Sequence, residues 1–254
     1  MTDDHALARE LAQRAGDLLL SIREEWAGAP EDAGELRAAG DAKSHELLMD
    51  ALREARPDDA VLSEEGKDDH ARLSARRVWI VDPLDGTREF GEIPRDDWAV
   101  HVALWEDGAL VAGAVGRPAR GDILATDQPP MRPQGLPETI RLAVSRSRPP
   151  AFVTALAERL GAELVPMGSA GIKATAVLDD TVDAYVHAGG QYEWDSAAPV
   201  AVALASGLHA SRIDGSALAY NRANPLLPDL LICRPEIAGP LLAAIANLTS
   251  EGHP

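Results

Sequence analysis

The stretch VWIVDPLDGTREF, residues 78–90, joins an apolar run to two aspartates. Val78–Val81 is short, apolar and β-branched, which is typical of a buried strand. Asp82 and Asp85 follow directly, and Pro83 restricts the backbone between them. Because Asp-Gly is also a common hairpin turn, a solvated turn is the alternative. The stretch therefore predicts either a turn or two carboxylates that converge at the end of a strand.

Helices followed by strands are predicted in the first half. Apolar residues at three-to-four spacing (Leu7, Leu11, Ala15, Leu18 and Ile22) predict a first helix that Gly28 and Pro30 close. A second helix is expected from about Lys43 to Arg56. Strands are expected at Ala60–Ser63, Val78–Val81, Trp98–Trp105, Ala109–Val115 and Gly121–Thr126. The hairpin signal Asp107-Gly108 favours antiparallel pairing among them.

A proline-rich segment, QPPMRPQGLPET at 128–139, predicts a boundary between a domain 1–138 and a domain 139–254. After it, strands alternate with helices, which predicts an α/β layer with a partly parallel sheet. The expected strands are Ile140–Ser145, Ala162–Pro166, Val182–His187 and Asp229–Cys233. The expected helices are Pro150–Leu160, Ser169–Leu178, Asp195–Ala205 and Pro235–Leu248.

Composition restricts the function. Among 254 residues, 41 are acidic and 24 basic, a net charge of −17, which argues against nucleic-acid binding. No apolar run is long enough to span a membrane, and the N-terminus is acidic where a signal peptide is basic. We therefore expect a cytoplasmic protein that binds neither nucleic acid nor membrane. The single cysteine, Cys233, is expected to be a buried hydrophobic residue.

Further carboxylates stand at comparable positions. Glu64, in SEEG, follows a predicted strand, and a solvated loop is the alternative. Asp195, in WDSAAP, begins a predicted helix, and a helix N-cap is the alternative. With Asp82 and Asp85 these are hard oxygen ligands without clustered His or Cys, a set that suits Mg²⁺ or Mn²⁺. The N–H groups after Asp85 can meet an anion, so the residues predict a metal-assisted phosphoester hydrolase.

The segments WIVDPLDGT (79–87), WDSAA (194–198) and SEE (63–65) together resemble the motifs of the inositol monophosphatase superfamily, which are Mg²⁺-dependent, lithium-sensitive phosphatases. The resemblance implies a layered αβαβα sandwich, with an antiparallel-sheet half followed by an α/β half. It places most metal ligands in 1–138. The part 139–254 is expected to supply Asp195 and the loops on the substrate side.

The resemblance also implies a ligand set. One metal ion would be held by Glu64, Asp82 and the backbone carbonyl of Leu84, and a second by Asp82, Asp85 and Asp195. A third ion near Asp41 stays open, because the family usually has a threonine where this chain has Ala38. Mg²⁺ is the expected metal, and Mn²⁺ can substitute for it.

Catalytic and phosphate-binding roles follow from the same resemblance. Glu64 and Thr87 would orient the attacking water, and Asp41 is a further catalytic candidate. The N–H groups of Gly86 and Thr87 would hold the phosphate, with Asp85 and Asp195 also against the substrate. The family resemblance further favours a homodimer.

Finer motifs indicate the substrate. Arg88-Glu89-Phe90, Pro199 and GSAGIK (168–173) resemble the 3′(2′),5′-bisphosphate nucleotidases of sulfate assimilation, which remove the 3′-phosphate of 3′-phosphoadenosine 5′-phosphate and of its sulfated form. An inositol-1-phosphatase or fructose-1,6-bisphosphatase on the same scaffold is the alternative. A non-catalytic sensor of nucleotide and metal is an alternative of another class.

A bisphosphate nucleotide needs cations for its second phosphate. The candidates are Arg88, Lys173, Arg146 and Arg148, each with a solvated charge as its alternative. Ser169 could donate to the substrate or cap a helix. The segment HAGGQYEW, 187–194, is expected to border the nucleoside, because its glycines permit close approach.

Overall fold

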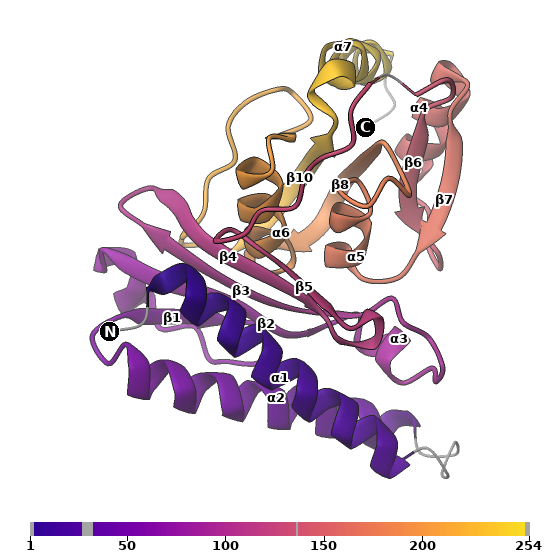
Figure 1. Ribbon diagram of the computed structural model, residues 1–254. Helices are drawn as coiled ribbons and strands as arrows, with labels where there is room; N and C mark the ends of the chain where they lie inside the picture. Colours follow the sequence, from indigo (N-terminus) through magenta and orange to yellow (C-terminus); the bar gives the residue numbers. More distant parts are fainter. Residues whose placement is uncertain (1–2, 27–32, 136, 252–254) are drawn as a thin grey trace.

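The chain folds into five layers in which helices and sheets alternate. The computed structural model describes residues 3–26, 33–135 and 137–251. Figure 1 shows helices α1 and α2 at the bottom, then a sheet, then α5 and α6, then a second sheet, with α4 and α7 on top. This is the predicted αβαβα arrangement.

The first sheet is built from the strands of the first half. Its order is β1-β2-β3-β4-β5, with β1 parallel to β2 and the remaining pairs antiparallel. The antiparallel prediction is therefore wrong for the first pair, because the chain crosses back through the 3₁₀ helix η2 (His70–Ser74) before β2 starts. The strands are β1 (Ala60–Ser63), β2 (Arg77–Asp85), β3 (Ala99–Glu106), β4 (Ala109–Arg117) and β5 (Asp122–Ala125).

Two long helices cover the outer face of this sheet. In α1 (Asp4–Trp26), most of the predicted apolar positions are buried, and the predicted helix end at Gly28 and Pro30 lies outside the described residues. The second helix, α2 (Ala33–Ala55), begins well before the predicted Lys43. Gly40 lies inside it, and a Cβ there would lie 2.7 Å from the ring of Phe90. The glycine permits close packing and does not end the helix.

The second sheet has the order β7-β6-β8-β10-β9. Parallel pairs join β6 to β7 and to β8, and antiparallel pairs join β10 to β8 and to β9, so the predicted partly parallel sheet is confirmed. The three-residue strand β9 was not predicted, since it is too short to show a pattern. The strands are β6 (Arg141–Ser145), β7 (Glu163–Met167), β8 (Ala184–Tyr192), β9 (His209–Ser211) and β10 (Leu226–Cys233).

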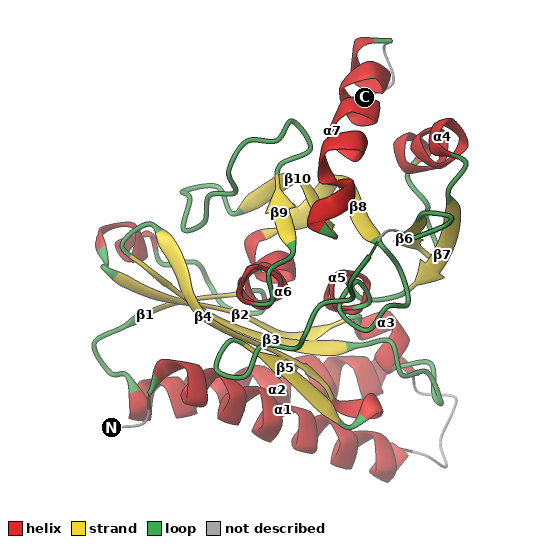
Figure 2. Cartoon of the chain, turned by 45° about the horizontal axis from the view of Figure 1, so that its top comes forward, coloured by secondary structure: helices red, strands yellow, loops and turns green. Residues whose placement is uncertain are grey.

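Helices α4 to α7 pack on the two faces of the second sheet, and Figure 2 shows α5 and α6 between the two sheets. One hydrophobic cluster contains Ile80 from the first sheet together with Val200 from α6 and Ile232 from the second sheet. The two halves therefore share a core, and a division at 138/139 remains a prediction. The helices are α3 (Thr87–Phe90), α4 (Ala151–Leu160), α5 (Ala170–Thr175), α6 (Glu193–Ala205), α7 (Pro235–Ser250) and the 3₁₀ turn η3 (Pro118–Arg120).

Two further sequence expectations concern single features. Cys233 is buried and free, as predicted, and burial raises the pKa of its thiol to about 12. In the described part of the chain, no helix combines the length and apolarity needed to cross a membrane.

Candidate metal centre

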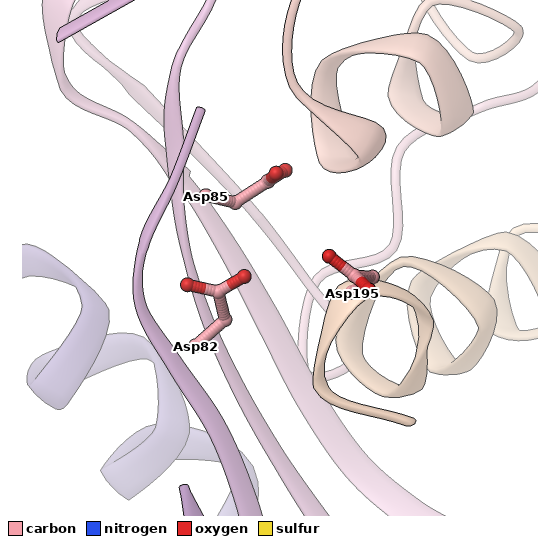
Figure 3. A group of neighbouring side chains, drawn as sticks. All are labelled: Asp82, Asp85 and Asp195. Atoms are coloured by element: carbon pink, nitrogen blue, oxygen red, sulfur yellow. The ribbon is translucent and has the colours of Figure 1, made fainter. Parts of the chain in front are cut away.

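Three aspartates from distant parts of the sequence converge between the sheets. Asp82 and Asp85 lie at the end of β2, and Asp195 lies in the first turn of α6. One carboxylate oxygen of each lies within 4.8 Å of those of the other two. Figure 3 shows the three side chains pointing into one space, and Asp82 and Asp85 are buried. The stretch at 82–85 thus brings carboxylates together instead of forming a solvated turn.

Glu64 stands beside this group of three. Because β1 and β2 are parallel, their C-terminal ends lie at the same edge of the sheet, and Glu64 follows β1 there. Its carboxyl group shares a hydrogen bond with that of Asp82. The residue is exposed as a whole, so it forms the rim of the cluster and not its floor.

The electrostatics show an excess of negative charge. Burial raises the pKa of Asp82 well above its usual value, and the neighbouring carboxylates raise it further. Burial and then the charge of Asp195 raise the pKa of Glu64 to about 7. Burial and then the charge of Asp85 raise the pKa of Asp195 to about 6. The negative charge of these carboxylates is not balanced by neighbouring cations in the described structure, and such a group of oxygen ligands fits a hard divalent cation.

Asp85 differs from its neighbours because the protein already binds its carboxylate. The N–H groups of Ala170 and Gly171 donate to it over 3.1 and 2.6 Å, and the Ser169 hydroxyl donates as well. Nε2 of His101 lies 3.2 Å from its Oδ2. Burial alone would raise the pKa of Asp85, but His101 and these donors lower it to about 2.

His101, on β3, is a site residue that the sequence analysis missed. It is fully buried, and its Nδ1 donates to the Trp194 carbonyl over 3.0 Å, one residue before Asp195. Burial alone would lower the pKa of His101, but the charge of Asp85 raises it. The available signal was a single polar residue inside the apolar run AVHVALW.

Thr87 and Asp41 face each other at one side of the cluster. The Thr87 hydroxyl oxygen lies 3.1 Å from Oδ1 of Asp41 and 3.1 Å from the carbonyl oxygen of Leu84. Burial raises the pKa of Asp41 to about 6, although the hydrogen bond from Thr87 opposes this. Asp41 lies inside α2 and is not an N-cap of that helix.

The turn before α3 requires a glycine. Gly86 has φ +85°, and a Cβ built on it would lie 3.0 Å from Cβ of Ser169. The absence of a side chain at Gly86 lets the start of α3 lie against the start of α5. Ser169 is the N-cap of α5 and accepts from the N–H of Ile172. Asp195 is not the N-cap of α6, because Tyr192 holds that position and its N–H donates to Asp195 over 2.6 Å.

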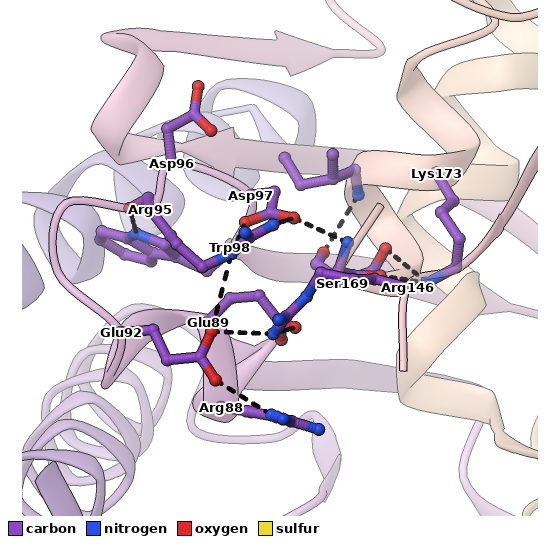
Figure 4. Close-up of polar contacts among 12 residues, drawn as sticks. Arg88, Glu89, Glu92, Arg95, Asp96, Asp97, Trp98, Arg146, Ser169 and Lys173 are labelled. Atoms are coloured by element: carbon purple, nitrogen blue, oxygen red, sulfur yellow. Dashed lines mark hydrogen bonds and ion pairs between the residues drawn. The ribbon is translucent and has the colours of Figure 1, made fainter. Parts of the chain in front are cut away.

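Two of the predicted phosphate-binding cations are paired with carboxylates. Arg88 donates to Glu92 over 3.0 Å, and Arg146 donates to Glu89 over 2.7 Å and to Glu92 over 2.9 Å. Figure 4 shows these contacts beside Ser169 and Lys173. Asp97 extends the group, since it accepts from Arg95 and from the N–H of Gly168. We name the set Arg88, Glu89, Glu92, Arg95, Asp97 and Arg146 the ion-paired seam.

The other two cations, Lys173 and Arg148, line a cavity of about 360 Å³ next to the cluster. The Lys173 ammonium is buried and donates to the backbone carbonyls of Gly168 and Ser169. Within the described ranges, the guanidinium of Arg148 has no ion-pair or hydrogen-bond partner. These two cations are therefore the ones available to an anionic ligand.

Comparison with known proteins agrees with this geometry. The model of the inositol monophosphatase family matches residues 2–249. The chain belongs to this family. A structure of a family member named CysQ from Bacteroides thetaiotaomicron is similar, with a TM-score of 0.76 and 27% identity over 91% of this chain and 97% of that one.

Curated relatives are more similar in sequence. A protein of Mycobacterium bovis named 3′-phosphoadenosine 5′-phosphate phosphatase is 53% identical over 92% of this chain and 90% of its own length. A protein of Mycobacterium leprae with the same name is 51% identical over 96% and 94%. The similarity therefore extends over nearly the whole of each protein and includes both halves of the site.

Proposed function

We propose that this chain is a Mg²⁺-dependent phosphomonoester hydrolase that removes the 3′-phosphate of 3′-phosphoadenosine 5′-phosphate. Water and the bisphosphate nucleotide would give AMP and inorganic phosphate, and the sulfated nucleotide would give adenosine 5′-phosphosulfate. The convergence of Asp82, Asp85 and Asp195 carries the proposal, because such a cluster fits a metal-assisted phosphatase. The names of the relatives at 51–53% identity support the choice of nucleotide.

The carboxylates would hold two Mg²⁺ ions, or Mn²⁺ in their place. The carboxylate of Asp82 interacts with those of Glu64, Asp85 and Asp195, so it is suited to bridge the ions. Among the described residues, Oδ1 of Asp85 accepts one hydrogen bond, from Ala170, and so retains capacity for a ligand bond. When bound, such ions polarise the phosphate and lower the pKa of water.

Thr87 is positioned to orient the attacking water. Its hydroxyl lies 3.1 Å from both the Asp41 carboxylate and the Leu84 carbonyl, so its single proton has an acceptor in the protein and its lone pairs can accept from water. Gly86 is the N-cap of α3 and Thr87 its first residue, where helix N–H groups have no partner within the helix. We assign them to the phosphate and assign Glu64, at the rim, to the water.

The second phosphate needs cations that are not neutralised. Lys173 and Arg148 meet this condition, whereas Arg88 and Arg146 are paired in the seam. The Ser169 hydroxyl donates to Asp85 and caps α5, so its contribution to substrate binding is through Asp85. We therefore propose Lys173 and Arg148 for the 5′-phosphate.

The test is phosphate release with Mg²⁺ at equal low concentrations of 3′-phosphoadenosine 5′-phosphate, inositol-1-phosphate and fructose-1,6-bisphosphate. We expect kcat/KM for the nucleotide to exceed the others by about a hundredfold or more. A sugar phosphate ahead would replace the nucleotide as substrate and leave the metal chemistry intact. Nucleotide binding without any phosphate release would indicate a sensor. A cytoplasmic location, a homodimer and inhibition by lithium remain predictions.

A further inference from the structure

The cavity beside the metal centre has features that the two phosphates do not use. It is formed where β6 ends, where α4 starts, along α5 and along β8. Burial raises the pKa of Tyr185 in its wall, and the charges of Asp195 and Asp85 raise it further, so the cavity and the cluster adjoin. It is lined by Val144, Ser145, Arg148, Pro150, Lys173, Tyr185, Val186, His187, Gly189, Gly190 and Gln191.

Gln191 brings an unused hydrogen-bond acceptor to this cavity. The residue is only 6% exposed. Its Nε2 donates to the Tyr185 hydroxyl oxygen over 2.7 Å, which leaves Oε1 as the other end of the amide. Its Oε1 is buried and has no hydrogen-bond partner in the described structure. Because a buried acceptor without a partner is unfavourable, this oxygen is suited to receive an N–H from a ligand.

The surroundings of Gln191 fit a planar polar ring. Nε2 of His187, on the same strand, is also buried without a partner among the described residues. Gly189 and Gly190 lie between these two side chains with φ of +85° and +87°, and nothing lies within 4 Å of a Cβ built on either. An L-residue with a side chain would be strained there, so glycine keeps this rim open.

The lining of the cavity therefore combines cations with polar atoms that can form hydrogen bonds. Lys173 and Arg148 supply the positive charge, and Gln191 and His187 supply polar atoms that have no partner among the described residues. A nucleotide has this division, because its phosphate is anionic and its base carries N–H groups and ring nitrogens. An inositol phosphate has hydroxyl groups in place of the base.

Resting on the proposed function, we infer that Gln191 is a specificity residue that accepts a hydrogen bond from the amino group of the nucleotide base through Oε1. Tyr185 is a positioning residue, since its hydroxyl holds the Gln191 amide. The enzyme should therefore discriminate between a purine with a 6-amino group and one with a 6-oxo group. The oxo group would place an acceptor against an acceptor.

The experiment compares kcat/KM for 3′-phosphoadenosine 5′-phosphate and for its 6-oxo analogue, 3′-phosphoinosine 5′-phosphate. We expect the wild-type enzyme to favour the amino base by at least about tenfold. Gln191→Leu should bring the ratio close to one, and Tyr185→Phe should reduce it in part. Gln128→Leu, at an exposed position outside the cavity, is the matched control and should keep the wild-type ratio. Damage to the fold would lower both rates and leave their ratio unchanged.

Each other outcome has a definite meaning. Equal wild-type rates for the two nucleotides, or an unchanged ratio in Gln191→Leu, overturn the role of Gln191 and leave the proposed function intact. A preference for the oxo base overturns the acceptor assignment, since Nε2 would then face the ligand. Hydrolysis of neither nucleotide, with inositol-1-phosphate hydrolysed, overturns the proposed function and this inference with it.

Discussion

Two regions rich in carboxylates lie side by side at the junction of the halves, and they differ in whether the protein supplies cations to balance the negative charge. In the ion-paired seam, the carboxylates of Glu89, Glu92 and Asp97 each accept from an arginine. In the metal centre, only Asp85 has a cationic side chain within ion-pair distance in the described structure, namely His101. The seam is thus neutralised by the protein, and the centre is not. A cluster of carboxylates that has few cationic partners in the protein therefore indicates a metal site more strongly than a cluster of carboxylates as such.

The largest expected effect is at Asp82. Asp82→Asn removes one negative charge at the position that we assign to both metal ions, so kcat should fall by at least about a hundredfold. Glu92→Gln, a matched loss of charge in the seam, should retain kcat within about threefold. Both are measured as phosphate release at saturating Mg²⁺. An Asp82→Asn variant that keeps more than about a tenth of kcat, a loss below about 1.4 kcal/mol, contradicts the bridging role.

Thr87 tests whether the centre orients water as well as metal. Thr87→Ala should lower kcat by about tenfold to a hundredfold with a smaller change in KM, because the hydroxyl acts on the water more than on substrate binding. Thr87→Ser keeps the hydroxyl between Asp41 and Leu84 and should restore most of the rate. A change in KM alone would remove the assignment.

The sign of the pH dependence also separates the two regions. The raised pKa values of Glu64, about 7, and Asp195, about 6, mean that protons compete with metal at neutral pH. Without metal, their contribution to folding stability is present at low pH and lost as pH rises through these values. Mg²⁺ should therefore bind about tenfold more tightly at pH 8 than at pH 6 and should raise Tm more at the higher pH.

Calorimetry and thermal unfolding, with and without Mg²⁺, measure this dependence. Arg146→Gln should leave the pH dependence unchanged, since Arg146 belongs to the seam and pairs with Glu89 and Glu92. An affinity for Mg²⁺ that does not change between pH 6 and 8 would contradict the raised pKa values of Glu64 and Asp195.

Local patterns in the sequence predicted the two halves and the candidate carboxylates, and the family resemblance implied the stacking of layers. Asp82 and Glu64 both lie at strand ends, which the sequence shows, but their meeting at one edge depends on the parallel pairing of β1 and β2, which was not predicted. Partner choice is not local. Arg146 and Arg148 are two residues apart in one loop, yet the first pairs with Glu89 on α3 and the second lines the cavity. His101 was missed for the same reason, because its role depends on contacts with Asp85 and Trp194 that only the fold creates.

The smallest expected effects come from these two arginines, which form a matched pair. Arg148→Gln should raise KM for 3′-phosphoadenosine 5′-phosphate by about fivefold, because one hydrogen-bonding cation to the second phosphate is lost. It should leave KM for inositol-1-phosphate unchanged. Arg146→Gln should leave both KM values unchanged and lower Tm by no more than about 4 °C, because a partly exposed ion pair contributes little to stability. The reverse pattern, in which Arg146→Gln raises KM for the nucleotide, would mean that Arg146 leaves its ion pairs in the seam and binds the substrate.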